Sequence, residues 1–225
     1  MSDTATLQPF AEGGIGQRLL AVLDNGGPVL ILLALLSVFT LTLILLKLWQ
    51  FAVARLYDRK TLEEALASWH AGETGQALQR LEASRYVGAE PLAAAMRGRL
   101  DAQLEEGRLR EEVTRLASGR LEQLRAYLRG LEVIGMLSPL LGLLGTVLGM
   151  IEAFRQLEAA GSQVDPAMLS GGIWEALLTT AAGMALAIPA VAALTWLERV
   201  VERFRHRLED AVTQVFTAPP PHHAA

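Results

Sequence analysis

The sequence contains no cysteine, and this absence removes a whole class of chemistry. Without thiols the chain has no disulfide framework, no thiolate metal site and no cysteine nucleophile. The 225 residues also lack a strong excess of charge of either sign, since the formal net charge is -4. Basic residues alternate with acidic ones, as on a solvated helix face, so the charge pattern gives no case for nucleic acid binding.

Enzyme motifs are missing too. The glycines of "GLLGTVLG" (142–149) are not followed by the Lys-Ser/Thr pair of a phosphate-binding loop. The sequence has no His-Glu-x-x-His motif and no serine in a nucleophile elbow. His222 and His223 lie in the final stretch "APPPHHAA", which reads as a disordered tail. We therefore expect no enzymatic activity, no cofactor and no metal site.

Apolar residues make up 52% of the chain and gather in three uncharged runs. These runs cover residues 28–46, 133–151 and 176–197, with lengths of 19, 19 and 22 residues. A hydrocarbon core of about 30 Å requires about 20 apolar helical residues, so each run is long enough to cross a membrane. The sequence predicts an all-α membrane protein with three transmembrane helices. No small-residue cleavage site follows the first run, which favours an uncleaved first helix.

The distribution of Lys and Arg predicts the orientation of these helices. Thirteen basic residues lie in 52–131, one lies in each of 1–27 and 152–171, and four lie in 198–225. Because basic residues accumulate on the cytoplasmic side, the N-terminus is expected outside and the C-terminus in the cytoplasm.

The basic region between the first two spans is predicted to be helical. Thr61 and Glu64 have the spacing of a capping box at a helix start. From about Glu111 onward no strong stop precedes the second span, because Gly119 and Gly130 each cost only about 1 kcal/mol relative to Ala. A single helix of about 40 residues, roughly 60 Å long, is therefore expected to run from the cytoplasm into the membrane.

The third helix is also expected to extend into the cytoplasm, because an apolar stripe continues beyond its span. The stripe consists of Val201, Phe204, Leu208, Val212 and Val215. Its helical spacing requires a packing partner, and the extension of the second helix is the nearest candidate.

Small residues line one face of the second span. Within "SPLLGLLGTVLGM" (138–150), small residues recur at intervals of four, three and four, with a proline near the start. Such spacing lets helix backbones approach closely in lipid. The predicted helix-packing residues are Ser138, Pro139, Gly142, Gly145 and Gly149, with Gly183 and Pro189 in the third span. Pro189 also removes one backbone donor from that span.

Two threonines are predicted to lie at similar depth in the membrane. Thr146 stands five residues before the outer end of the second run, and Thr180 stands five residues after Glu175, near the outer end of the third. One interpretation is that each hydroxyl bonds its own helix backbone. Their matched depth on small-residue faces favours a second interpretation, a polar patch that lines a shared cavity.

Charged residues mark both ends of the spans. Glu175 either reaches outward to the interface or faces the bundle interior or a water-filled path, as intramembrane carboxylates usually do. Thr179, four residues later, shares its helix face. For Lys47 a structural role is expected instead of a functional one, because its long side chain can reach the cytoplasmic interface.

The segments "LSPLLGLLGTVLGMIEAF" (137–154) and "GGIWEALLTTAAGMALAIPAV" (171–191) resemble the two signature segments of the MotA/TolQ/ExbB proton-channel family, and ExbB most of all. The resemblance implies a pentamer in the bacterial inner membrane that surrounds the helices of an ExbD-like dimer. It also implies a proton-driven motor whose output passes through a TonB-like protein to outer-membrane transport. Thr146 and Thr180 match the pore-lining threonines of the family, and Glu175 matches its membrane glutamate.

Two alternatives stay open at this point. One is a TolQ-like subunit of the Tol-Pal envelope-maintenance system, and the other is a non-conducting membrane scaffold in contact with lipid. The expected organisation is a periplasmic segment (1–27), a first transmembrane helix (28–51), a cytoplasmic helical region (52–130), a second transmembrane helix (131–151), a periplasmic loop (152–171), a third transmembrane helix (172–197) and a cytoplasmic extension with its tail (198–225).

Overall fold

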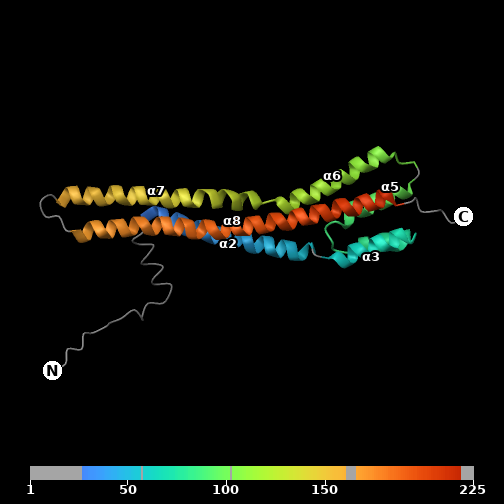
Figure 1. Ribbon diagram of the computed structural model, residues 1–225, viewed down its shortest axis with the longest axis horizontal. Helices are drawn as coiled ribbons and strands as arrows, with labels where there is room; N and C mark the ends of the chain where they lie inside the picture. Colours follow the sequence, from blue (N-terminus) through green and yellow to red (C-terminus); the bar gives the residue numbers. More distant parts are fainter. Residues whose placement is uncertain (1–26, 57, 102, 161–165, 219–225) are drawn as a thin grey trace, which may run out of the picture. The chain divides into compact units, whose positions relative to one another are not determined.

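The computed structural model describes residues 27–56, 58–101, 103–160 and 166–218. Within these ranges there is no strand, which confirms the predicted all-α fold. Figure 1 labels most of the helices, which are α2 (Gly27–Val53), α3 (Arg59–His70), α4 (Thr74–Ala83), α5 (Ala89–Leu100), α6 (Glu106–Arg125), α7 (Leu128–Ala160) and α8 (Pro166–Thr217). Three of them, α2, α7 and α8, contain segments long and apolar enough to cross a membrane, as the sequence predicted.

The chain divides into two units. We call Met1–Phe39 with Val133–Ala190 the apolar unit, and Thr40–Glu132 with Val191–Ala225 the polar unit. The predicted N-terminal segment, residues 161–165 and the end of the tail with His222 and His223 lie outside the described residues.

In the apolar unit, α7 and α8 lie side by side and antiparallel (Figure 1). Gly142 approaches Gly183, Gly149 approaches Ala176, and Ala153 approaches Gly172, so the residue number rises on one helix as it falls on the other. Large apolar side chains such as Leu140 and Ile188 are exposed on the outer surfaces. An apolar exterior of this kind suits contact with lipid or with other membrane helices.

In the polar unit, α3, α4, α5 and α6 pack against one another in succession. The ring of Tyr86, between α4 and α5, packs edge-on against Phe204 of α8 with 5.9 Å between ring centroids. Burial raises the pKa of Tyr86 to about 12, although the nearby Arg207 acts in the opposite direction. Arg207 also donates to the carbonyl oxygen of Leu56 at 3.0 Å. Phe204 of the α8 stripe therefore contacts the segment between α4 and α5, which the sequence did not indicate. The expected partner also reaches α8, because Arg110 of α6 lies 4.5 Å from the ring centroid of Phe216.

The prediction of one uninterrupted helix from Glu111 through the second span is wrong. The structure ends α6 at Arg125 and begins α7 at Leu128, and Tyr127 adopts a left-handed backbone with a φ of 65°. At this end of α6 a residue distant in sequence replaces the helical donor, since Lys47 Nζ donates to the carbonyl oxygen of Leu124 at 3.1 Å. A cation can satisfy the last carbonyls of a helix in this way, and that allows the helix to end.

The predicted capping box at Thr61 and Glu64 is also wrong. Asp58 is the N-cap of α3, where its carboxylate accepts from the Thr61 amide at 3.2 Å and from the Thr61 hydroxyl at 3.0 Å. Glu64 instead pairs with Lys60 at 3.8 Å. The N-cap lies three residues earlier than expected, at Asp58 instead of Thr61, because a carboxylate is a strong acceptor for helix-start amides.

Helical structure also runs further toward the loop between the second and third spans than expected. α7 ends at Ala160 and α8 begins at Pro166, so the interval between them is shorter than the predicted loop 152–171. Glu and Gln residues that follow the second apolar run are good helix formers, and no glycine or proline interrupts them before Ala160. Glu152 therefore belongs to α7.

Candidate functional site

The small residues of α7 lie where this helix contacts α8 of the same chain. A Cβ atom placed on Gly142 would lie 2.9 Å from the carbonyl oxygen of Thr179 and 3.0 Å from the Cα atom of Thr180. A Cβ atom on Gly145 would lie 2.5 Å from the hydroxyl oxygen of Thr179. No side chain larger than glycine fits at these positions without movement of α8, so close backbone approach explains the glycines.

The opposite side of the same contact is equally close. A Cβ atom on Gly183 would lie 2.5 Å from the carbonyl oxygen of Ser138 and 3.0 Å from the Cα atom of Gly142. Ser138 itself is fully buried, and its hydroxyl donates to the carbonyl oxygen of Ile134 at 2.6 Å. Pro139 and Pro189 lie inside α7 and α8, which continue through both of them.

Two α8 hydroxyls converge on one carbonyl of α7. The hydroxyl oxygens of Thr179 and Thr180 lie 3.2 Å and 3.1 Å from the carbonyl oxygen of Gly142. Thr179 is buried, and its single hydroxyl proton is shared between the Gly142 carbonyl and the nearer carbonyl oxygen of Ala176 in α8, at 2.7 Å. Hydrogen bonds between helices replace the water that is absent from a bilayer core, so this carbonyl fixes the register of the two helices.

The other threonine, Thr146, is half-buried and makes a local bond. Its hydroxyl donates to the carbonyl oxygen of Leu143, one turn earlier in α7, at 2.6 Å. The structure thus brings Thr179 and Thr180 together at Gly142, whereas Thr146 bonds only its own helix among the described residues.

A cavity of about 180 Å³ lies beside this contact, and two carboxylates line it. Glu175 contributes from α8 and Glu152 from α7, while the first residues of α2 close a further side. Within the described residues neither carboxylate forms an ion pair, although Gln156 donates to Glu152 at 3.2 Å. The lining residues are Gly27, Pro28, Val29, Gly145, Leu148, Gly149, Glu152, Glu175, Ala176 and Thr179.

Such a cavity has the components of a proton-handling site. A carboxylate can accept and release a proton, and hydroxyls and backbone carbonyls can orient the water that carries it. The cavity unites Glu175 and Thr179, two of the four residues predicted for a proton path. Thr146 and Thr180 do not line it.

Glu152 was missed because the sequence placed it at the start of a loop. A signal was nevertheless present: Glu152 follows Gly149 by three residues and so continues the four-three spacing of the small-residue face. The described residues contain no group of three or more histidine, aspartate or glutamate side chains that could hold a metal ion.

Comparison with known proteins identifies the family of this chain. The sequence model of the MotA/TolQ/ExbB proton channel family matches residues 83–210, more than half of the chain. The chain belongs to this family. The family and the three apolar helices together make it a membrane protein of the inner membrane, and the prediction of the family is confirmed.

Individual relatives cover different shares of the chain. The biopolymer transport protein exbB1 of Vibrio cholerae is 44% identical over 38% of this chain and 40% of its own length. The ExbB protein of Neisseria meningitidis is 30% identical over 79% of this chain and 86% of its own length. The Tol-Pal system protein TolQ of Pseudomonas aeruginosa is 41% identical over 43% of this chain and 38% of its own length. Both ExbB and TolQ proteins are therefore relatives.

Proposed function

We propose that the chain is an ExbB-like subunit of a motor in the bacterial inner membrane that is driven by the proton gradient. In this proposal several copies, five by resemblance to the family, surround the helices of an ExbD-like partner. The motor then energises outer-membrane transport through a TonB-like protein. The observation that supports this most directly is the cavity that holds Glu175 and Glu152 beside the close contact of α7 and α8.

We propose that the polar residues of this region act together. Glu175 exchanges protons or positions the water that does so, while Thr146 and Thr180 provide hydroxyls along the path. Thr179 is buried and bonds Gly142, so it supports the path by holding α7 and α8 in register. The small-residue face is occupied by a contact within one chain, and another surface of α7 and α8 is therefore left for the partner helices.

A TolQ-like role in the Tol-Pal system is the second candidate, because TolQ of Pseudomonas aeruginosa is 41% identical over 43% of the chain. Complementation separates the two. The chain and its genomically neighbouring small partner are expressed in one strain that lacks its own ExbB-ExbD pair and in another that lacks its TolQ-TolR pair. Restored growth on a siderophore supports the ExbB-like role, and restored detergent resistance supports the TolQ-like role.

Proton conductance separates both roles from a scaffold. Vesicles containing the purified complex with its partner are expected to take up protons when a potential is applied. A complex that assembles but conducts no protons under any potential supports the scaffold and contradicts the motor.

The proposed orientation has its own test. A reporter fused after Asp165 should be external, and one fused after Arg97 should be cytoplasmic, because thirteen basic residues lie in 52–131 and only one in 152–171. The reverse pattern would overturn the orientation and place the cavity of Glu175 near the cytoplasm.

A further inference from the structure

Lys47 is a fully buried cation near the end of α2, and no carboxylate pairs with it among the described residues. Its sequence position led us to expect that the side chain would reach outward to the cytoplasmic interface, but the side chain is buried instead. The ammonium donates to Gln50 Oε1 at 2.8 Å and to the carbonyl oxygen of Leu124 at 3.1 Å. It also lies 5.8 Å and 5.7 Å from the ring centroids of Phe51 and Tyr127. These partners compensate for lost hydration, since aromatic faces attract cations and carbonyls accept their protons.

Two of these contacts reach the end of α6 and the turn after it, namely the hydrogen bond to the Leu124 carbonyl and the approach to the Tyr127 ring. Gln50, also on α2, adds a further hydrogen bond to this end of α6, from its side-chain amide to the carbonyl oxygen of Gln123 at 3.4 Å. In an uninterrupted helix the carbonyl of Leu124 would accept from the amide of Leu128. Here Lys47 takes that place, and the chain turns at Ala126 and Tyr127 before α7 begins.

The local sequence does not itself impose this turn. The stretch "LEQLRAYLRGL" (121–131) contains no proline, and its glycine comes three residues after Tyr127. Tyr127 has a φ of 65°, a left-handed conformation that costs free energy for any residue with a Cβ atom. The sequence of this stretch therefore favours a continuous helix, and the contacts from α2 favour the turn.

We propose that Lys47 is a latch that α2 provides to α6, and that the turn at Ala126–Tyr127 is one of two states of this segment. In the second state Leu128 bonds Leu124, Tyr127 returns to helical geometry, and Lys47 leaves its buried position. The latch and the turn together connect the conformation at the end of α2 to that at the start of α7. This connection involves no proton path and no partner, so it goes beyond the proposed function and does not depend on it.

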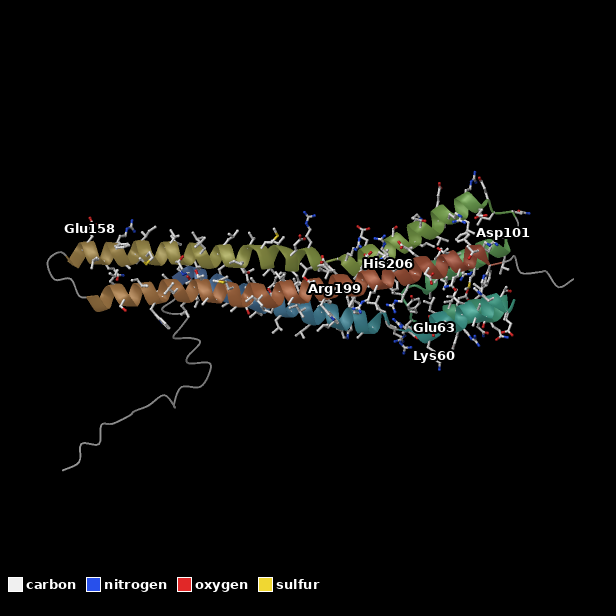
Figure 2. The ribbon with its side chains drawn as sticks, viewed as in Figure 1. Lys60, Glu63, Asp101, Glu158, Arg199 and His206 are labelled. Carbon is white, nitrogen blue, oxygen red and sulfur yellow. The ribbon has the colours of Figure 1, made fainter. Side chains whose placement is uncertain are left out.

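The chain offers an unusually direct probe, because Lys47 and Lys60 are its only lysines. Lys60 lies on α3 with its side chain 86% exposed, and Figure 2 labels it there. The full-length chain, purified in the assembly that it forms, is treated with an amine-reactive acetylating ester, and each lysine is followed by peptide mass spectrometry. We expect the ratio of the Lys47 acetylation rate to the Lys60 acetylation rate to be at least about tenfold lower in the folded assembly than in denaturant, because burial excludes the reagent from Lys47. Equal relative rates in both conditions would overturn the latch.

A matched pair of variants tests the second state. Tyr127→Gly and Tyr127→Ala both remove the ring from an exposed position, and they differ mainly in the cost of a positive φ. Glycine adopts that conformation freely, whereas alanine does not. Lys47 should therefore react faster in Tyr127→Ala than in Tyr127→Gly, by about tenfold, with Lys60 unchanged in both. The same Lys47 rate in the two variants would show that the segment has no second state.

Discussion

Among the described residues, the apolar unit buries the hydroxyls of Ser138 and Thr179, whereas the polar unit buries the ammonium of Lys47 in addition to the hydroxyls of Thr40 and Ser68. Ser138 and Thr179 each donate to a carbonyl oxygen in their own helix, one turn away. Lys47 donates to Leu124, which lies 77 positions away. Both hydroxyls thus have an acceptor within their own helix, whereas the Lys47 ammonium divides its hydrogen bonds between Gln50, one turn away, and a carbonyl oxygen of another helix.

The two units also differ in what holds their helices together. In the apolar unit the contact depends on glycines and on the Gly142 carbonyl, so it tolerates almost no added volume. In the polar unit large apolar side chains such as Leu92, Met96 and Phe204 are buried, and ion pairs lie on the surface. Exposed ion pairs contribute at most about 1 kcal/mol each, so apolar burial is the main stabilising term there.

The largest expected effect comes from added volume in the glycine contact. Gly142→Leu should prevent α7 and α8 from packing, because its Cβ atom alone would lie 2.9 Å from the Thr179 carbonyl oxygen. Overpacking typically costs about 1–3 kcal/mol, and a rigid backbone neighbour makes relief difficult. The yield of folded, assembled protein after mild detergent extraction measures the loss.

Gly119→Leu is the matched control for that substitution. Gly119 lies in α6 with no atom within 4 Å of a Cβ position, so leucine there should be neutral or slightly stabilising. Normal assembly of Gly142→Leu would contradict the close contact.

The next effect concerns charge in the cavity. Glu175→Gln keeps the shape of the side chain and removes its ability to exchange a proton, so we expect most energised growth on a siderophore to be lost while the complex still assembles. Glu158→Gln is the control, because Glu158 is exposed near the end of α7 and does not line the cavity (Figure 2). Equal growth of the two variants would remove Glu175 from the proposed proton path.

Loss of a single hydroxyl should have a smaller effect. Thr180→Val removes the bond to the Gly142 carbonyl but preserves most of the packing, and Thr146→Val removes only the local bond to Leu143. One hydrogen bond is worth about 1 kcal/mol, which corresponds to about a fivefold lower rate of energised uptake if it acts in the transition state. Uptake of a labelled siderophore, with partner pull-down as the assembly control, measures both variants. Unchanged uptake in both would show that these hydroxyls are structural.

Periodicity and composition predicted the three spans and the all-α fold because lipid restricts what an apolar run can form. The four-three spacing of Gly142, Gly145 and Gly149 likewise predicted a close helix contact, but not that α8 of the same chain would be the partner. The α6–α7 turn could not be predicted, since the stretch around it contains no proline and the Lys47 bond to the Leu124 carbonyl comes from a distant part of the chain. Glu152 could have been found by extending the spacing by three residues beyond Gly149.

The smallest expected effect lies in the polar unit, at the start of α3. Asp58→Ala removes the acceptor of both the Thr61 amide and the Thr61 hydroxyl and should lower the free energy of unfolding by about 1 kcal/mol. Thr61→Ala removes only a hydroxyl and leaves the amide bonded to Asp58, so its effect should be smaller. If Thr61 and Glu64 formed a capping box, the order would be reversed, because Thr61 would then carry the cap. Thermal unfolding of the two full-length variants, compared at one detergent concentration, distinguishes the two orders.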